Sequence, residues 1–98
     1  MTQDGIWIHP EQLKEQAAIV RESAVSLAAL SRQMEENLAE LEKNWLGNDA
    51  VSGIRRGRTL RGELQICAES FLALSDSMKQ IAQQSEEAEK TAGKVIDG

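Results

Sequence analysis

The sequence predicts an all-α fold, an antiparallel hairpin of two long helices that dimerises into a four-helix bundle. The first reason is composition: Ala, Leu, Glu, Gln and Lys are abundant, whereas aromatic residues make up 3% and Pro occurs once, a balance that favours helix over sheet. The second is that apolar residues recur at alternating steps of three and four in two long segments, as along one face of a helix. The third is length, because 98 residues form a single domain with a thin core that a partner subunit would complete.

The first helix is expected over about residues 10–45, after a lead-in at residues 6–8 that could pack along the hairpin. Pro10 suits the first turn of a helix, where its missing N–H costs nothing. His9 lies next to the N-cap, and without neighbouring metal ligands it is expected to be a helix-entry residue rather than a ligand or base. The apolar positions step by four and three, interrupted by one Ser: Leu13, Ala17, Val20, Ala24, Leu27, Ser31, Met34, Leu38, Leu41 and Trp45.

A turn is expected at residues 46–48. Gly47 can adopt the left-handed conformation that ends many helices. Asn48 and Asp49 are both good N-caps for a second helix. This stretch therefore predicts the corner of the hairpin.

The second helix is expected over about residues 49–92, followed by a flexible tail at residues 93–98. Its apolar positions keep the same rhythm: Leu46, Ala50, Gly53, Gly57, Leu60, Leu64, Cys67, Phe71, Leu74, Met78, Ile81, Ser85, Ala88, Ala92 and Val95. Gly53 and Gly57 each weaken a helix by about 0.5–1 kcal/mol relative to Ala. We expect them to let the helices approach closely or to make room for the Trp45 indole, with local fraying as the alternative.

Two apolar rows of equal period joined by a short turn must face each other, so paired positions have numbers that add up to about 93. A run of glutamates in the first helix then lies near a run of arginines in the second: Glu35, Glu36, Glu40 and Glu42, and Arg55, Arg56, Arg58 and Arg61. We expect the glutamates to neutralise the arginines. The alternative is an arginine patch for phosphate or for an acidic partner.

The middle of the first helix, residues 17–30, is apolar nearly all round, which exceeds what a helix with one neighbour needs. A second hairpin is therefore expected to dock here. The residues expected at the partner interface are Ala17, Val20, Ala24, Leu27, Leu30, Cys67, Phe71 and Leu74. A membrane is not expected on this surface, because the polar face is acidic rather than basic.

No arrangement of residues suits catalysis or a cofactor. The sequence has no phosphate-binding glycine loop, no metal-ligand spacing and no nucleophile paired with a His, so we expect no enzyme, cofactor or metal. Cys67, the one cysteine, is expected to be a small buried side chain. The net charge of −5 argues against general nucleic-acid binding. Without a basic n-region or a long apolar run, neither a cleaved signal peptide nor a transmembrane helix is expected.

The turn Trp45-Leu46-Gly47, at the middle of two long predicted helices, resembles the motif of the Trp-X-Gly family. These are small early-secreted-antigen-like hairpins that type VII secretion systems export from Gram-positive and mycobacterial cells. The stretch from Ile6 to Leu13 also resembles the start of the family. The resemblance implies that Trp45 and Gly47 form the motif turn, and that the protein is made in a bacterial cytoplasm and secreted without a cleaved signal peptide.

The resemblance also implies partners. They are a related hairpin, in a homodimer or heterodimer with antiparallel four-helix packing, the helical N-terminal domain of a larger secreted protein, and the secretion ATPase. The family's tail signal, an aromatic residue followed four positions on by an acid, is not matched: Phe71 is followed at that spacing by Ser75. The expected function is a non-enzymatic substrate or partner protein of type VII secretion that acts through helix–helix binding. The alternative is a cytoplasmic helical adaptor or chaperone that is not itself exported.

Overall fold

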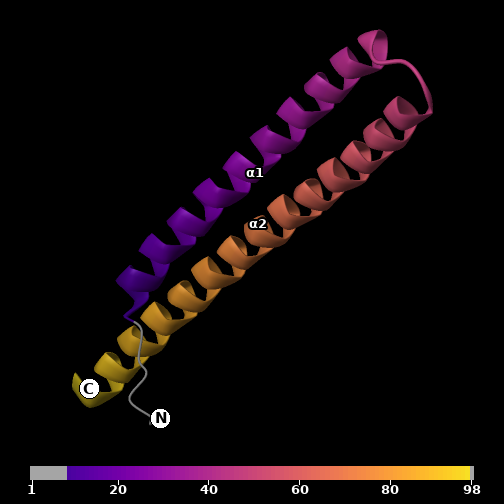
Figure 1. Ribbon diagram of the computed structural model, residues 1–98. Coiled ribbons are helices and arrows are strands. Elements are labelled where there is room, and N and C mark those ends of the chain that lie inside the picture. The colour runs from indigo at the N-terminus through magenta and orange to yellow at the C-terminus, as the bar shows by residue number, and fades with distance from the viewer. Residues whose placement is uncertain (1–8, 98) are drawn as a thin grey trace.

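The computed structural model describes the chain over residues 9–97, and its side chains over residues 9–91. Two helices, α1 (Pro10–Asn44) and α2 (Asn48–Asp97), fold back on each other at a short link (Figure 1). The molecule measures 76 × 23 × 13 Å between its Cα atoms, so it is a long, flat slab. This confirms the predicted all-α antiparallel hairpin, whereas assembly with a second hairpin stays a prediction.

Helix α1 begins and ends where its sequence allows. His9 is the N-cap, and its Nδ1 atom accepts a hydrogen bond from the backbone N–H of Glu11 at 3.4 Å. Pro10 follows in the first turn, where no N–H is needed. The helix ends because Trp45 adopts an extended conformation, although its N–H still donates to the Leu41 carbonyl at 2.7 Å. His9 therefore has the predicted helix-entry role.

The corner depends on Gly47, whose φ of +107° lies in a region that L side chains rarely adopt. The backbone N–H of Val51 donates to the Gly47 carbonyl at 3.2 Å, so the hydrogen bonding of α2 starts at Gly47. Asn48 is thus the first helical residue rather than the predicted N-cap. Asp49 lies in the first turn of α2, where the partial positive charge of the helix end favours a carboxylate.

Helix α2 extends to Asp97, beyond the predicted end near residue 92. The predicted flexible tail at residues 93–97 is therefore helical. Gly93 costs only about 1 kcal/mol relative to Ala, and no Pro follows it to stop the helix. The lead-in at residues 6–8 lies outside the described residues.

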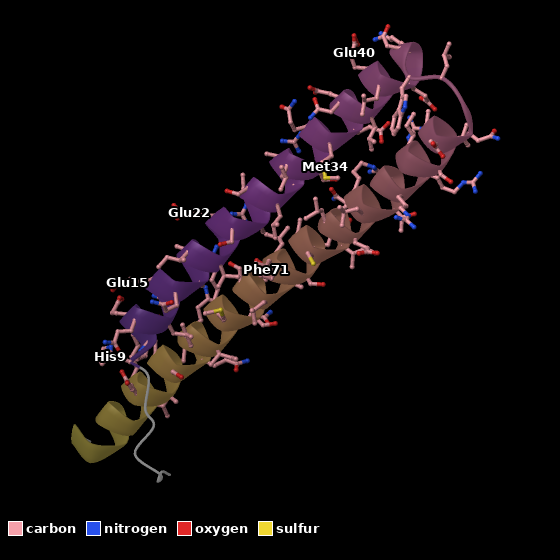
Figure 2. The ribbon with its side chains drawn as sticks, in the orientation of Figure 1. His9, Glu15, Glu22, Met34, Glu40 and Phe71 are labelled. Carbon is pink, nitrogen blue, oxygen red and sulfur yellow. The ribbon has the colours of Figure 1, made fainter. Side chains whose placement is uncertain are left out.

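Small side chains fill the seam between the helices. Figure 2 shows Glu15, Glu22 and Glu40 on the side of α1 that faces away from α2. The buried residues of α1 recur every seven positions: Pro10, Ala17, Ala24, Ser31 and Leu38. Those of α2 are Ala50, Ile54, Ala68, Ser75 and Ala82. Two serines bond to the backbone of the opposite helix: Ser31 Oγ donates to the Arg61 carbonyl at 3.2 Å, and Ser75 Oγ donates to the Ala17 carbonyl at 2.9 Å. Both pairs have numbers that add up to 92, close to the predicted 93.

Two glycines make room for large side chains of α1. A Cβ atom at Gly53 would lie 2.7 Å from the indole of Trp45, and one at Gly57 would lie 2.5 Å from a methyl group of Leu38. Both distances are shorter than real Cβ atoms tolerate. The predicted role of these glycines in close approach and in accommodating the indole is confirmed.

The predicted seam of α2 was wrong in one of its two rows. The apolar residues Leu60, Cys67, Leu74 and Ile81 were expected to face α1, but all four are exposed. The row one position further along the chain is turned toward α1 instead: Ile54, Arg61, Ala68, Ser75 and Ala82. Both rows have the same spacing, and the small residues of the second row let the backbones approach closely enough for the Ser75 hydrogen bond. Cys67 is consequently not the buried residue that the sequence predicted.

Candidate functional site

The seam divides the hairpin into two broad faces. On one side a shallow groove is lined by Ser23, Leu27 and Phe71 among others. On the other side a second groove is lined by Ala28 and Leu72, together with further residues of both helices. Residues seven positions apart lie on the same side of a helix, so each groove continues along two rows of side chains on each helix.

The first face carries no Asp, Glu, Lys or Arg along the rows nearest the seam, and we call it the uncharged face. Glu22, which also lines its groove, lies just outside these rows. On α1 the uncharged face consists of Leu13, Gln16, Val20, Ser23, Leu27, Leu30, Met34, Asn37 and Leu41. On α2 it consists of Gly57, Leu60, Leu64, Cys67, Phe71, Leu74, Met78, Ile81, Ser85 and Ala88.

Large apolar side chains of the uncharged face are open to solvent within the single hairpin. Leu30 is 49% exposed, Leu74 is 51% exposed and Ile81 is 52% exposed. The seam cannot bury them, because Ala and Ser already occupy the space between the helices. Continuous apolar strips of this kind are typical of surfaces that bind another molecule.

The predicted interface residues divide into two groups. Ala17 and Ala24 are 0% and 4% exposed, so they are part of the seam and cannot contact a second chain. The other six all lie on the uncharged face: Val20 and Leu27, which are half-buried, and Leu30, Cys67, Phe71 and Leu74, which are exposed. Leu60 and Ile81 were not predicted to be surface residues, because their row was expected to form the seam.

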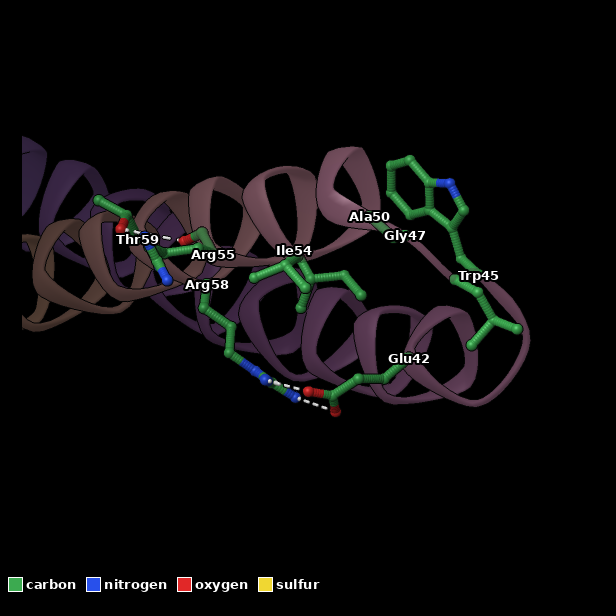
Figure 3. Close-up of a pocket in the computed structure, with 10 residues that line it drawn as sticks. Glu42, Trp45, Gly47, Ala50, Ile54, Arg55, Arg58 and Thr59 are labelled. Atoms are coloured by element: carbon green, nitrogen blue, oxygen red, sulfur yellow. Dashed lines mark hydrogen bonds and ion pairs between the residues drawn. The ribbon is translucent and has the colours of Figure 1, made fainter.

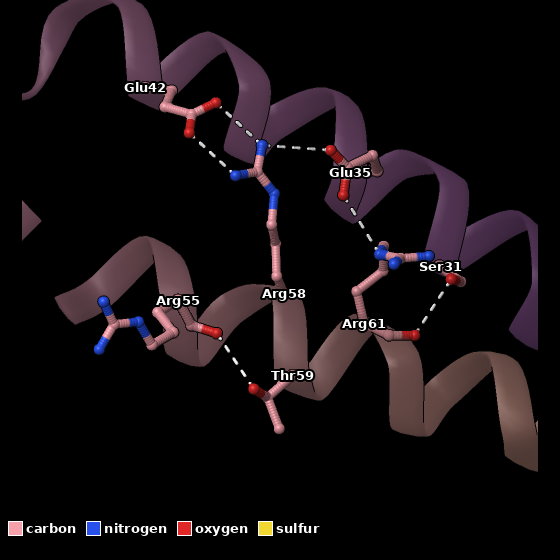
Figure 4. A network of polar contacts seen from close by, with 7 residues as sticks. All are labelled: Ser31, Glu35, Glu42, Arg55, Arg58, Thr59 and Arg61. Atoms are coloured by element: carbon pink, nitrogen blue, oxygen red, sulfur yellow. Dashed lines mark hydrogen bonds and ion pairs between the residues drawn. The ribbon is translucent and has the colours of Figure 1, made fainter. Parts of the chain in front are cut away.

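The opposite face, which we call the charged face, joins the two helices by ion pairs (Figure 4). Arg58 binds Glu42 through two parallel hydrogen bonds of 2.9 Å, and its Nη2 atom also lies 3.4 Å from Glu35 Oε2. Arg61 Nε lies 3.2 Å from Glu35 Oε1, although its N–H is not aimed to form a hydrogen bond. At the far end, Lys14 Nζ donates to Glu86 Oε2 at 2.8 Å.

These ion pairs shift the pKa values of Glu42, Arg58 and Lys14. The hydrogen bonds from Arg58 hold the pKa of Glu42 below its ordinary value. The hydrogen bonds to Glu42 and Glu35 raise the pKa of Arg58, and the hydrogen bond to Glu86 raises the pKa of Lys14. All of these shifts favour the charged forms, so Arg58, Glu42 and Lys14 find opposite charges within one chain.

The predicted neutralisation of arginines by glutamates is confirmed for Arg58 and Arg61. Arg55 and Arg56 are exposed, and no ion pair joins them to another side chain that the structure describes. Arg55 lies at the edge of the hairpin corner, where its carbonyl accepts a hydrogen bond from Thr59 Oγ1 at 3.2 Å. The two arginines are thus the part of the cluster that remains open to a ligand.

The motif residues Trp45 and Gly47 lie beside a hollow of about 640 Å³ at the hairpin corner (Figure 3). Gly47 makes the turn, and the indole of Trp45 lies over Gly53 but remains 41% exposed. Leu46, which is 86% exposed, projects into solvent. The remaining residues that line the hollow are Glu42, Ala50, Val51, Ile54, Arg55, Arg58 and Thr59.

Two kinds of feature are absent from the described residues, a metal-binding cluster and a membrane-spanning stretch. No group of three or more His, Cys, Asp or Glu side chains in this part of the chain could hold a metal ion. Neither α1 nor α2, as far as each is described, contains a stretch long and apolar enough to cross a membrane. The uncharged face and the corner are therefore the two surfaces on which a functional argument can be based.

Comparison with known proteins gives no match. No family model fits the chain, and neither the curated proteins nor the solved structures include one that matches it.

Proposed function

We propose that this protein is a non-enzymatic binding protein of a type VII secretion system, either a substrate or a partner, that acts by docking a helical hairpin onto its uncharged face. The observation that carries the proposal is that face itself. Its apolar strip is too large for the seam to bury, and the rows of side chains beside the seam on this face carry no charge that would oppose their removal from water.

The secretion role is supported by the corner. Trp45 and Gly47 are positioned at the turn between two long helices, as the resemblance to the Trp-X-Gly family requires. The partner would be a related hairpin or the helical N-terminal domain of a larger secreted effector or toxin. The secretion ATPase would then recognise the assembled complex.

A second candidate function is supported by a specific departure from the family. The aromatic residue that should precede an acid by four positions is Phe71, but Ser75 takes the place of the acid and is fully buried. A protein without this signal would act as a cytoplasmic adaptor or chaperone, or would leave the cell only with a partner that supplies the signal.

Export can be tested directly in the producing bacterium. The protein is followed by immunoblot in cells and in culture supernatant, in the parent strain and in one lacking the membrane ATPase of the secretion system. We expect the protein in the supernatant of the parent strain and not in that of the mutant. Retention inside the cells of a strain whose secretion system is active would contradict export and favour the adaptor role.

A further inference from the structure

We infer that the hollow at the hairpin corner binds a small organic carboxylate, a molecule with one negative charge and an apolar chain or ring. Its apolar part would lie on Ala50 and Ile54, and its carboxylate would pair with Arg55. The inference goes beyond the proposed function, because it concerns a different surface and needs no second hairpin.

The hollow has the size and the lining of a small-molecule site. Its volume of about 640 Å³ lies within the range of roughly 300–1,000 Å³ that is usual for such sites. Ala50 and Ile54 are buried and form its floor, and Figure 3 shows Ile54 between the two helices. Leu46 and Val51, which are 86% and 58% exposed, form an apolar rim. A ligand would therefore remove from water apolar side chains that the single hairpin leaves uncovered.

The local fold keeps this space unfilled. Gly47 has no side chain, and the Trp45 indole is held against Gly53, where a Cβ atom would lie 2.7 Å from the ring. Figure 3 shows the indole turned to the opposite side of the corner from Glu42 and Arg58. The largest side chain of the corner thus stands at the edge of the hollow and does not plug it.

The charge of the lining favours an anion. One carboxylate, Glu42, and two guanidinium groups, Arg55 and Arg58, line the hollow of a protein whose net charge is −5. Arg58 holds Glu42 through two hydrogen bonds of 2.9 Å, so each satisfies the other. No ion pair joins Arg55 to another described side chain, and Figure 4 shows its guanidinium apart from that pair. Arg55 is therefore the charge that is left for a ligand, and guanidinium and carboxylate make strong charge-assisted hydrogen bonds.

Other classes of ligand fit the lining less well. An uncharged hydrocarbon would cover the apolar floor but would gain nothing from Arg55. Inorganic phosphate would pair with Arg55, but it would leave the floor uncovered and would bring a second negative charge near Glu42. A single carboxylate on an apolar group uses both parts of the lining.

The hollow is separate from the surface on which a hairpin would dock. Glu42 and Arg58, which line it, belong to the charged face, on the other side of the seam from Leu27 and Phe71. Binding of a carboxylate and docking of a partner can therefore be measured independently.

Titration with decanoate, and with 1-decanol as the same chain without the charge, tests the inference. The full chain is labelled with ¹⁵N and followed by NMR at neutral pH, below the concentration at which decanoate forms micelles. We expect decanoate to shift the backbone amide signals of Val51, Ile54 and Arg55, and to leave those of Leu27 and Phe71 unchanged. We expect 1-decanol to bind at least about fivefold more weakly, because it cannot pair with Arg55.

Two neighbouring arginines provide a matched pair of variants. Arg55→Gln removes the charge in the lining and is expected to weaken decanoate binding at least about fivefold, with no effect on 1-decanol. Arg56→Gln removes an equal charge from the next residue, which does not line the hollow, and is expected to change binding less than about twofold. Both side chains are exposed, so both variants are expected to fold, and circular dichroism checks this.

Equal binding of decanoate by the native protein and Arg55→Gln, or equal weakening by the two variants, would overturn the pairing with Arg55. Shifts at Phe71 without shifts at Ile54 would overturn the corner as the site. If decanoate shifts no signal, the inference as a whole is wrong, and the secretion experiment above would still decide the proposed function separately.

Discussion

The two broad faces of this hairpin have opposite chemistry, although they flank the same seam. On the charged face, Arg58 and Lys14 form ion pairs with carboxylates on the opposite helix. On the uncharged face, Leu30, Leu74 and Ile81 find no space in the seam and stay open to water. A seam of Ala and Ser leaves these larger apolar side chains facing outward, in rows that carry no charge.

The largest expected effect is a difference in self-association between two matched substitutions on α2, one on each face. Leu74→Glu places a carboxylate on the uncharged face, and Leu72→Glu places one on the charged face two residues away. Burying an unpaired carboxylate costs several kcal/mol, so Leu74→Glu is expected to weaken self-association roughly 100-fold or more. Leu72→Glu is expected to change it less than about threefold.

Sedimentation equilibrium of the two variants and the native protein measures this difference. Circular dichroism of both variants checks that the helices are retained. Equal weakening by the two substitutions, or no weakening by Leu74→Glu, would show that the faces are not distinguished by partner binding.

A smaller effect concerns the seam that separates the faces. Ala17 is fully buried and its carbonyl accepts the Ser75 hydrogen bond, whereas the neighbouring Ala18 is exposed. Ala17→Leu forces extra carbons between closely packed backbones and is expected to lower the free energy of unfolding by about 1–3 kcal/mol. Ala18→Leu is expected to change it by less than about 0.5 kcal/mol.

Urea unfolding followed by circular dichroism measures both changes at one protein concentration. The concentration is held fixed because assembly also contributes to apparent stability. If both variants unfold at the same urea concentration as the native protein, the two helices are packed less closely at Ala17 than its complete burial indicates.

The smallest effect concerns the charged face in acid. Because the folded-state pKa of Glu42 is lowered, its pairing with Arg58 stabilises the fold fully above the ordinary glutamate pKa and loses this contribution as the pH falls through the lowered value. Stability is therefore expected to decline in the acid range, and Glu42→Gln to flatten part of that decline. Glu36→Gln serves as the control, since Glu36 is exposed and no ion pair joins it to another described side chain.

Urea midpoints at a series of pH values between 7 and 3 test this expectation for the native chain and the two variants. An identical pH dependence of the native protein and Glu42→Gln would show that the pair contributes nothing to the fold. The uncharged face has no titratable group in this range, so its contribution is expected to stay constant across the series.

Local chemistry made much of the fold predictable from the sequence. Pro10 and Gly47 constrain the backbone in specific ways, and they placed the start of α1 and the corner correctly. The pairing of Glu35 and Glu42 with Arg58 followed from the position of each residue along the axis of an antiparallel hairpin. These features depend on single residues or on simple geometry, which a sequence specifies directly.

The choice of seam row could not be predicted in the same way. Cys67 and Ala68 belong to rows of identical spacing, and apolarity alone favours the row that contains Leu60 and Leu74 over the row that contains Ser75. What decides is how closely two backbones can approach, and that depends on all the small residues of both helices together. The two heptad rows that contain Leu60 and Phe71 have no Asp, Glu, Lys or Arg between residues 57 and 88, and this pattern is the signal in the sequence that could have identified an exposed apolar face.

The flat, rod-like shape has a practical consequence for anyone who measures the mass of this protein. A particle 76 Å long and 13 Å thick diffuses more slowly than a sphere of equal mass. Size-exclusion chromatography calibrated with globular standards would overstate its molecular weight, and a lone hairpin could elute where a compact dimer is expected. Static light scattering and sedimentation equilibrium give a mass that does not depend on molecular shape, so they can determine the number of chains.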